Sequence, residues 1–289
     1  MSKWIVKEML GLFLRYSGLA PLIRFLRARS GVSVVVYHDP APETFERHMA
    51  FLSKRYSFIS MDTLADALAS GDWSRIPPYA LVVTLDDGHR GNYALLDVIR
   101  RYDVFPTLYL CSGIVDTHRR FWWKTPTVNI EALKNEPHAV FLEQLQEEAA
   151  FRPEKEYPDR QALNRDELLE MQPHVCFGAH TRFHPILTRC DDETCRGEMV
   201  ASKDELEALL GQEIKHFAYT NGDYGERERG HARDFGFQSA RGLDVGWNTK
   251  ARDRFSLKVT GVQDDASLNV LGAQLCGVFG AIRRLKGTS

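Results

Sequence analysis

The chain has 289 residues, 44% hydrophobic and 26% charged, which is long enough to bury a large core as one α/β domain or as two smaller domains. Lys and Arg total 37 against 39 for Asp and Glu, without a long block of either sign, so nothing indicates a nucleic-acid partner. The five cysteines are scattered without a CxxC pair, which is typical of reduced thiols rather than of a disulfide framework.

The first 30 residues differ from the rest because apolar clusters alternate with basic residues and Glu8 is the only acid. The apolar stretch is too short and too charged to span a bilayer, and no cleavage site of a signal peptide follows it. One helical face would carry a set of large apolar side chains: Ile5, Met9, Leu12, Phe13 and Tyr16. Two interpretations stay open, an anchor at an anionic membrane surface and a helix pair packed on the domain with solvated basic residues.

From residue 31 to 289 the chain reads as one domain in which strands and helices alternate. Apolar, β-branched runs predict strands at residues 32–38, 57–61, 79–87, 105–111, 174–180, 214–220, 237–241 and 255–262. Helical patterns fall between them at 44–56, 62–70, 92–102, 192–211 and 226–236. Asp62 is the expected N-cap of the second of these helices. Strands separated by helices predict a parallel sheet or a β/α barrel, with ligands at the carboxyl ends of the strands.

Residues 116–164 break this alternation and are expected to form an insertion with a helix at 139–151. The insertion either covers the site or simply extends the surface.

Two adjacent carboxylates, Asp86 and Asp87, end the strand at 79–87, where Gly88 allows the backbone to turn. Another strand is followed by His180 and His184, and two imidazoles with one carboxylate form a familiar open zinc-type site. If Asp87 binds the cation, Asp86 can stay ionised beside it as a general base. The alternative is that Asp86 caps the following helix, which leaves the histidines unexplained.

These motifs resemble those of the polysaccharide deacetylases with the NodB homology domain, carbohydrate esterase family 4. TLDDG at 84–88 is similar to the family's TFDDG, with Leu85 in place of Phe, and HTRFHP at 180–185 matches H(S/T)xxHP. The resemblance covers about residues 32 to 260 apart from the insertion.

It implies a distorted (β/α) barrel with Asp86 as the base and with Asp87, His180 and His184 as ligands of a divalent metal. The metal is commonly Zn²⁺, with Co²⁺ or Ni²⁺ in related members. The implied reaction is hydrolysis of an N- or O-acetyl group on a sugar, with release of acetate.

The third family motif, F-R-P-P-Y-G, is replaced here by FAYTNG at 217–222, so Ala218 stands where an arginine usually orients the base. A branch that acts on bacterial exopolysaccharides has FAYP-G in this place. We expect Tyr219 and Asn221 to contact the substrate, with a backbone N–H near Asn221 stabilising the oxyanion. Arg241 or Lys258 could orient the base instead of the missing arginine.

The family's usual acid histidine near the C-terminus is absent, because no histidine follows residue 231. The strand VVVYHD resembles the circularly permuted branch, which includes poly-N-acetylglucosamine deacetylases and has this histidine on the first strand. The resemblance assigns His38 as general acid, and the alternative is a hydrogen-bonded core histidine. Trp247 is a candidate for stacking on sugar faces, as are Trp122 and Trp123, although packing of the insertion is the stronger expectation for that pair.

The expected function is that of a metal-dependent hydrolase of carbon–nitrogen bonds other than peptide bonds, acting in cell-envelope or exopolysaccharide metabolism. Its expected partners are an acetylated amino-sugar oligosaccharide, a polysaccharide or a lipid-linked sugar, and an anionic membrane surface. We expect a cytoplasmic protein, peripheral on the inner face of the membrane. The alternatives are a non-catalytic carbohydrate-binding protein on the same fold and a deformylase or other amidase of a lipid-linked amino sugar.

Overall fold

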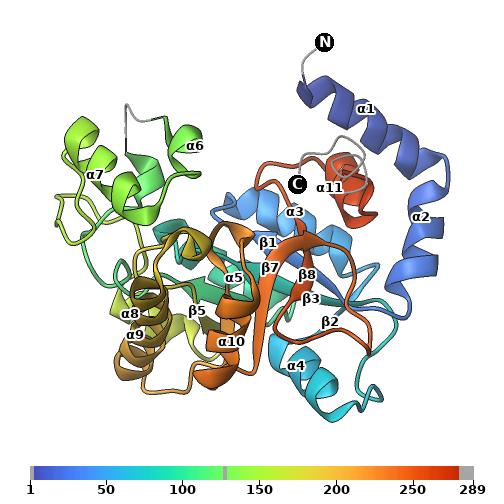
Figure 1. The fold of residues 1–289 in the computed structure, drawn as a ribbon. Helices are drawn as coiled ribbons and strands as arrows, with labels where there is room; N and C mark the ends of the chain where they lie inside the picture. Colours follow the sequence, from blue (N-terminus) through green and yellow to red (C-terminus); the bar gives the residue numbers. More distant parts are fainter. Residues whose placement is uncertain (1–2, 126–128, 280–289) are drawn as a thin grey trace.

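The computed structural model describes residues 3–125 and 129–279, in which parallel strands close into a barrel (Figure 1). The strands are β1 (Ser33–Tyr37), β2 (Ser57–Phe58), β3 (Ala80–Leu85), β4 (Thr107–Leu110), β5 (Cys176–Ala179), β6 (His216–Ala218), β7 (Ser239–Val245) and β8 (Leu257–Gly261). Their order is β1-β8-β7-β6-β5-β4-β3-β2, and a further pairing of β1 with β3 closes a ring of seven strands. The expected distorted (β/α) barrel is confirmed, and β2 is a short addition to β3.

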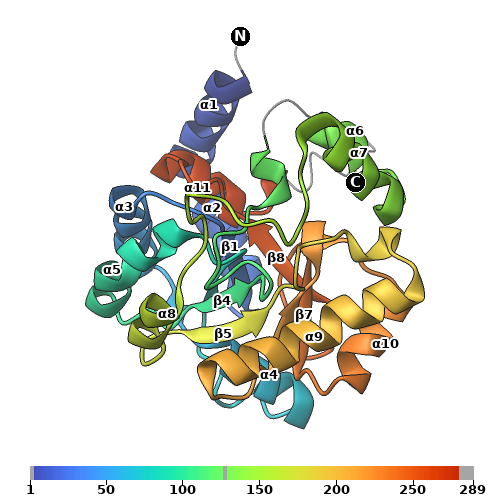
Figure 2. The same cartoon turned by 90° about the vertical axis from the view of Figure 1, so that its left-hand side faces the viewer.

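Helices surround the barrel and follow the strands in sequence (Figure 2). They are α3 (Pro42–Leu52), α4 (Met61–Ser70), η2 (Arg90–Leu95), α5 (Leu96–Arg101), α8 (Arg165–Met171), η4 (Leu187–Arg189), α9 (Asp192–Leu210), η5 (Thr220–Gly222), α10 (Glu226–Asp234) and α11 (Leu268–Leu275). Alternate residues of β1 and β3 enter different apolar clusters, because neighbouring side chains of a strand point to opposite faces. One cluster joins Val34, Val36 and Val82 to Met61 and Leu64 of α4.

The predicted strand at 57–61 is only two residues long, and α4 begins at Met61, one residue earlier than expected. Ser60 has an extended backbone, and its hydroxyl accepts a hydrogen bond from the Thr63 N–H at 3.1 Å, so Ser60 is the N-cap. The prediction of Asp62 as the N-cap was therefore wrong. Asp62 lies in the first helical turn, and its carboxylate contacts His216 instead.

The N-terminal segment forms α1 (Lys3–Tyr16), α2 (Leu19–Ile23) and a π-helical turn, η1 (Arg24–Ala28). Helix α1 lies against α11 so closely that a Cβ at Gly11 would be 2.6 Å from the carbonyl carbon of Asn269. Lys7 and Arg15 reach α11 or the loop before it through hydrogen bonds. Among the described residues no single helix is long and apolar enough to cross a membrane, although Ile5–Tyr16 and Leu19–Ala28, bent by 73°, meet that test as a pair.

The insertion contains η3 (Trp122–Lys124), α6 (Ile130–Leu133) and α7 (His138–Ala149), the last of which matches the predicted helix. It has a small apolar cluster of its own, made by Trp122, Leu133, Phe141, Leu145 and Phe151. Helices α1 and α6 rise at the same end of the barrel in both views (Figures 1 and 2).

Candidate active site

The two adjacent aspartates lie where β3 ends, and both side chains reach one cavity of about 500 Å³. Asp87 has a φ of 71° and Gly88 a φ of 77°, so the chain turns sharply directly after Asp86. Residue 88 must be small, because a Cβ there would lie 2.7 Å from the Leu110 side chain. Both carboxylates are buried, with 3% of each residue exposed. Burying two neighbouring charges requires cationic partners for them.

Asp86 has such a partner in Arg241 of β7, whose Nη2 donates a hydrogen bond to Asp86 Oδ1. Arg241 is completely buried, and its guanidinium lies over the Tyr109 ring at 4.6 Å from the centroid. A buried ion pair fixes the direction of a carboxylate that would otherwise be costly to bury.

Strand register explains how Arg241 replaces the family's usual arginine. Arg241 is directly paired with Ala218, the residue that stands at the arginine position of the third motif. The guanidinium therefore comes from the neighbouring strand to the same end of the barrel. Of the two basic residues suggested by the sequence, Arg241 contacts Asp86, whereas Lys258 packs its side chain against Gly246.

Asp87, His180 and His184 form a buried group whose ligand atoms lie close enough to hold one metal ion. Asp87 Oδ1 is 3.6 Å from Nε2 of both histidines and has no hydrogen-bond partner among the described residues. His180 Nδ1 lies 2.7 Å from the Ala218 carbonyl oxygen, to which it donates, so in the neutral ring Nε2 carries a lone pair toward the carboxylate.

Burial lowers the pKa of both imidazoles, and for His184 the proximity of His180 adds to the effect of burial, so that its pKa falls to about 3. Neutral His180 thus turns an acceptor nitrogen toward an acceptor oxygen, an arrangement that favours a cation between them, and His184 Nδ1 has no hydrogen-bond partner among the described residues. The donor set of one carboxylate and two imidazoles suits Zn²⁺ or a similar divalent ion.

The backbone around this group is unusual, because several residues with side chains have left-handed φ angles. Besides Asp87, these are Thr181 at 62°, His184 at 59° and Asn221 at 55°. Hydrogen bonds hold His184 in place: its N–H donates to the Thr181 hydroxyl at 3.0 Å, and its carbonyl accepts from the Trp122 indole at 2.9 Å. Thr220, which replaces a common proline, donates its hydroxyl to the Pro185 carbonyl and so joins the third motif to the second.

His89 is a residue of this cluster that the sequence motifs did not identify. It is 3% exposed, and its Nε2 donates to Asp87 Oδ2 at 3.0 Å. Its Nδ1 accepts from Lys124 Nζ at 3.2 Å, so the insertion supports the ring. Burial opposes ionisation of Asp87, but the hydrogen bond from His89 and the nearby imidazoles hold its pKa below the ordinary value. The sequence signal for this role of His89 is its position directly after the DDG motif.

Replacing His89 with Ala should weaken metal binding by about 10- to 100-fold, because partners of metal ligands orient them at about this energy. Titration of the purified protein against a chromogenic chelator measures the affinity. His174→Ala, which removes a partly exposed imidazole elsewhere, is the matched control and should bind metal as the wild type does. Equal affinity of His89→Ala and wild type would show that Asp87 needs no such support.

Three more predicted residues line the cavity: His38, Tyr219 and Asn221. His38 follows β1 with an exposed side chain, so the alternative of a core histidine is wrong. Tyr219 is buried, and its hydroxyl donates to the Phe255 carbonyl, so only its ring wall faces the cavity. The Asn221 backbone N–H donates to no acceptor within residues 3–125 and 129–279.

Trp247 is not brought to this cavity. Its ring reaches Gly277, and its Cβ lies next to the position of a Gly31 side chain, before β1 begins. The prediction that Trp247 contacts the substrate is therefore wrong, because the residue follows the bulged end of β7 and packs near the amino end of β1. Trp122 and Trp123 do line the cavity, and the Trp123 ring is 4.4 Å from that of His184. The insertion thus covers the site while Trp122 also packs its core.

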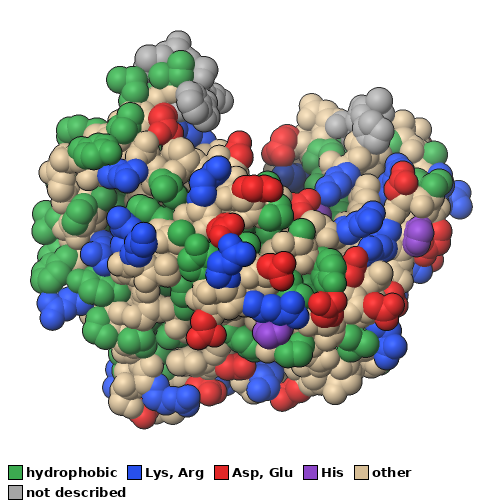
Figure 3. Space-filling model, turned by 180° about the vertical axis from the view of Figure 1, so that it is seen from behind, with side chains coloured by type: hydrophobic (Ala, Val, Ile, Leu, Met, Phe, Trp, Pro, Cys, Tyr) green, Lys and Arg blue, Asp and Glu red, His purple; other side chains and the backbone are tan. Residues whose placement is uncertain are grey.

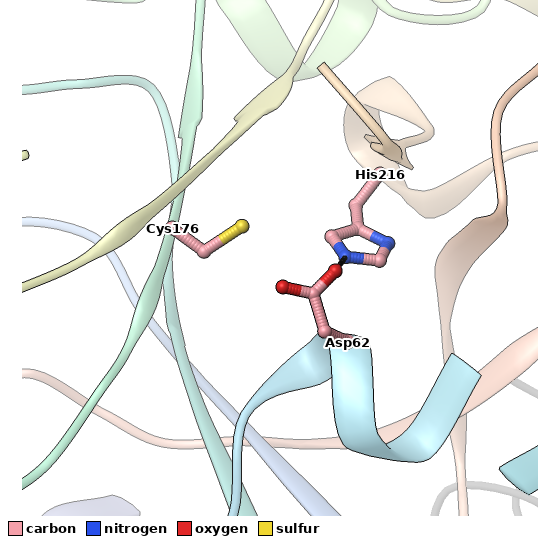
Figure 4. Close-up of side chains that lie close together, drawn as sticks. All are labelled: Asp62, Cys176 and His216. Atoms are coloured by element: carbon pink, nitrogen blue, oxygen red, sulfur yellow. Dashed lines mark hydrogen bonds and ion pairs between the residues drawn. The ribbon is translucent and has the colours of Figure 1, made fainter. Parts of the chain in front are cut away.

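A second group that could hold a metal lies at the amino ends of the strands, made by Asp62, Cys176 and His216 (Figure 4). Here both nitrogens of His216 already have partners, Ser239 Oγ at 2.9 Å and Asp62 Oδ1 at 3.0 Å. Lys215 Nζ lies 3.7 Å from the same Asp62 oxygen and supplies positive charge. This group is satisfied without a cation and links α4 to β6.

Asp62→Asn should lower the free energy of unfolding at neutral pH by about 1 kcal/mol, the usual net value of one such contact. The hydrogen bond from His216 lowers the pKa of Asp62 in the folded state. The stabilisation is therefore complete above the ordinary carboxyl pKa of about 3.9 and is lost as the pH falls below it. Urea denaturation at neutral and acidic pH measures the effect. Asp66→Asn, at an exposed position of α4, should leave stability nearly unchanged, and an equal loss in both variants would contradict the argument.

A parallel barrel with a base-type carboxylate beside an Asp-His-His group at its carboxyl end defines a barrel hydrolase. Residues 75–240 match the family model described as polysaccharide deacetylase, and the chain belongs to that family. His38 and Arg241 lie outside the matched range. No curated protein sequence matches the chain.

Solved structures of deacetylases have the same fold. The Streptococcus pyogenes deacetylase PplD is 17% identical, with a TM-score of 0.63 over 85% of this chain and 98% of that one. IcaB from Ammonifex degensii is 16% identical, with a TM-score of 0.61 over 86% and 97%. The BpsB deacetylase domain from Bordetella bronchiseptica is 14% identical, with a TM-score of 0.57 over 80% and 95%.

Proposed function

We propose that this protein is a metal-dependent deacetylase that removes the N-acetyl group from an amino sugar of the cell envelope or of an exopolysaccharide. The observation that carries the proposal is the contact of Asp86 with Arg241 beside the buried group of Asp87, His180 and His184. Binding alone would not require a fixed, charged carboxylate next to a metal-binding carboxylate. The names of the similar structures, which are deacetylases, support the same reaction class.

A divalent ion held by Asp87, His180 and His184, with Zn²⁺ the first candidate, would polarise the acetyl carbonyl and make a water molecule more acidic. Asp86 accepts the proton of the attacking water, while Arg241 keeps the carboxylate aimed into the cavity. The free backbone N–H at Asn221 donates to the developing oxyanion. His38 gives a proton to the nitrogen as the carbon–nitrogen bond breaks, which releases acetate and a free amine.

Product analysis tests this reaction directly. The purified protein, loaded with Zn²⁺ or Co²⁺, is incubated with N-acetylated, O-acetylated and N-formylated amino-sugar substrates. Release of acetate together with a new primary amine supports the proposal. Release of formate alone would make the protein a deformylase, and acetate without an amine would make it an esterase. No product from any of the substrates, with metal bound, would support a binding protein instead.

We also propose that the enzyme works at the inner face of a membrane on a lipid-linked or nucleotide-linked sugar. The support is the exposed apolar surface of the N-terminal helices, which rise at the same end of the barrel as α6, a wall of the catalytic cavity. Comparison of turnover on the same amino sugar with and without a lipid carrier, in the presence of vesicles, tests this placement. Equal turnover would contradict it.

A further inference from the structure

The N-terminal helices carry most of the large apolar side chains that the structure leaves exposed. This apolar face consists of Ile5, Val6, Met9, Leu12, Phe13, Tyr16, Leu19, Leu22, Phe25 and Leu26, each between 39% and 75% exposed. Elsewhere in the described chain the large apolar side chains that are exposed are Phe105, Leu169 and Leu243, at 36% to 41%. Contiguous apolar surface of this kind marks an interaction site. Figure 3 shows it as hydrophobic side chains gathered on the left of the view, with Lys and Arg among them.

Next to the apolar face lies a cavity of about 260 Å³ with three arginines in its wall: Arg15, Arg24 and Arg55. It lies between the N-terminal helices, α3 and α11, and its remaining wall is largely apolar, including Tyr16, Pro21 and other side chains. Tyr16 and Pro21 are exposed, so the cavity opens beside the apolar face.

The three guanidiniums lack anionic partners. None of them forms an ion pair with a carboxylate among the residues that the structure describes. Their hydrogen bonds go to neutral groups: Arg15 donates to the Asn269 side chain, Arg24 to the Arg55 carbonyl and Arg55 to the Phe51 carbonyl.

The three positive charges repel one another. Burial and the positive charges of Arg15 and Arg24 lower its pKa. Aromatic rings hold two of the cations in place, since Arg24 lies 4.5 Å from the Tyr79 ring centroid and Arg55 lies 3.9 Å from that of Phe51. The cavity is therefore a fixed cluster of positive charge that an anion would stabilise.

We propose that this arginine cavity binds the phosphate of an anionic phospholipid while the apolar face of α1, α2 and η1 enters the acyl region of the bilayer. The negatively charged phosphate would form charge-assisted hydrogen bonds with the three guanidiniums, which have no carboxylate partner among the described residues. The apolar rim and the adjacent apolar face favour a phosphate that carries hydrocarbon chains over a soluble one. Exposed Arg27, Arg29 and Lys54 add basic charge nearby, as an amphipathic helix on an anionic surface requires.

The inference rests on the proposed membrane placement, but it does not depend on the deacetylase reaction. Its failure is therefore separable from failure of the proposed reaction, because turnover of a soluble amino sugar is measured on the same preparations. A variant that keeps this turnover is folded and has an intact catalytic cavity.

Flotation with vesicles of phosphatidylcholine, with and without phosphatidylglycerol, tests the site. The double variant Arg15→Gln/Arg55→Gln should bind the anionic vesicles roughly 30-fold more weakly than the wild type, because each basic residue near a charged surface adds about fivefold to the affinity. The control double variant Arg165→Gln/Arg196→Gln removes the same charge from exposed positions on α8 and α9 and should bind nearly as the wild type.

Equal weakening in both double variants would overturn the site, since net charge alone would then explain binding. Wild-type binding by Arg15→Gln/Arg55→Gln, or no flotation of the wild type, would overturn it as well. Inorganic phosphate is added as a competitor for the site. If it displaces the protein from the vesicles only at concentrations far above that of the lipid, the lipid is supported as the ligand. Displacement at comparable concentrations would make the site one for free phosphate. Phe13→Ser/Leu26→Ser should lose binding to both kinds of vesicle.

Discussion

Asp86→Asn is expected to lower kcat/KM for an N-acetylated sugar by about 10²- to 10⁴-fold, the range that a positioned general base contributes. The amide is close in shape to the carboxylate and can keep an oxygen toward Arg241, but it cannot accept the proton of the attacking water. Acetate release under saturating and dilute substrate separates kcat from KM, and the loss should fall on kcat. Metal content should stay as in the wild type, because Asp86 is not one of the three grouped ligands.

Asp39→Asn is the control for this variant. Asp39 is exposed beside His38, and its Oδ2 lies 3.9 Å from Lys124 Nζ. The substitution therefore removes a nearby negative charge without touching Asp86. It should retain activity within a few-fold. If Asp86→Asn kept full activity while Asp39→Asn lost it, the assignment of the base would be wrong.

Asp87→Ala is expected to leave the purified protein with little bound metal and without measurable acetate release. Removing the carboxylate leaves two neutral imidazoles, an incomplete donor set for a divalent ion. Mass spectrometry of metal content, after the protein is loaded and then passed over a chelating resin, measures the loss. Chelation of the wild type should abolish activity in the same way, and Zn²⁺ or Co²⁺ should restore it.

The chain supplies its own control in the second group of potential ligands. Asp62→Asn alters the group of Asp62, Cys176 and His216 and should leave the metal content unchanged. Metal retained by Asp87→Ala but lost by Asp62→Asn would place the ion at the amino ends of the strands. That result would falsify the site proposed for the reaction.

The sequence was sufficient for the barrel, because its strands are apolar, β-branched runs separated by helical patterns. The DDG and HTRFHP motifs also indicated Asp87, His180 and His184, which the structure brings together in one buried group. Each of these signals is local: the identity of a few neighbouring residues determines it. That is why they could be read without the structure.

Contacts that depend on register or on the path of a loop could not be predicted in the same way. Arg241 meets Asp86 because β7 pairs with β6 so that Arg241 faces Ala218, a fact that no local pattern encodes. The His89 ring, a partner of Asp87, is also held by Lys124 and Phe121 of the insertion, contacts that no local pattern encodes. Trp247 was misplaced for the converse reason, since the register shift within β7 sends the following residues away from the cavity.

The left-handed backbone at Thr181 and His184 limits how the protein can be made more heat-resistant. Such conformations cost about 1–3 kcal/mol each in residues with side chains, and here they lie in the loop that carries the histidines of the proposed metal site. Substitutions that remove these left-handed conformations would therefore raise thermal stability but lower activity. Stabilising substitutions are better placed on the outer helices. At Gly197 within α9, for instance, an added Cβ would meet no atom of a neighbouring element within 4 Å.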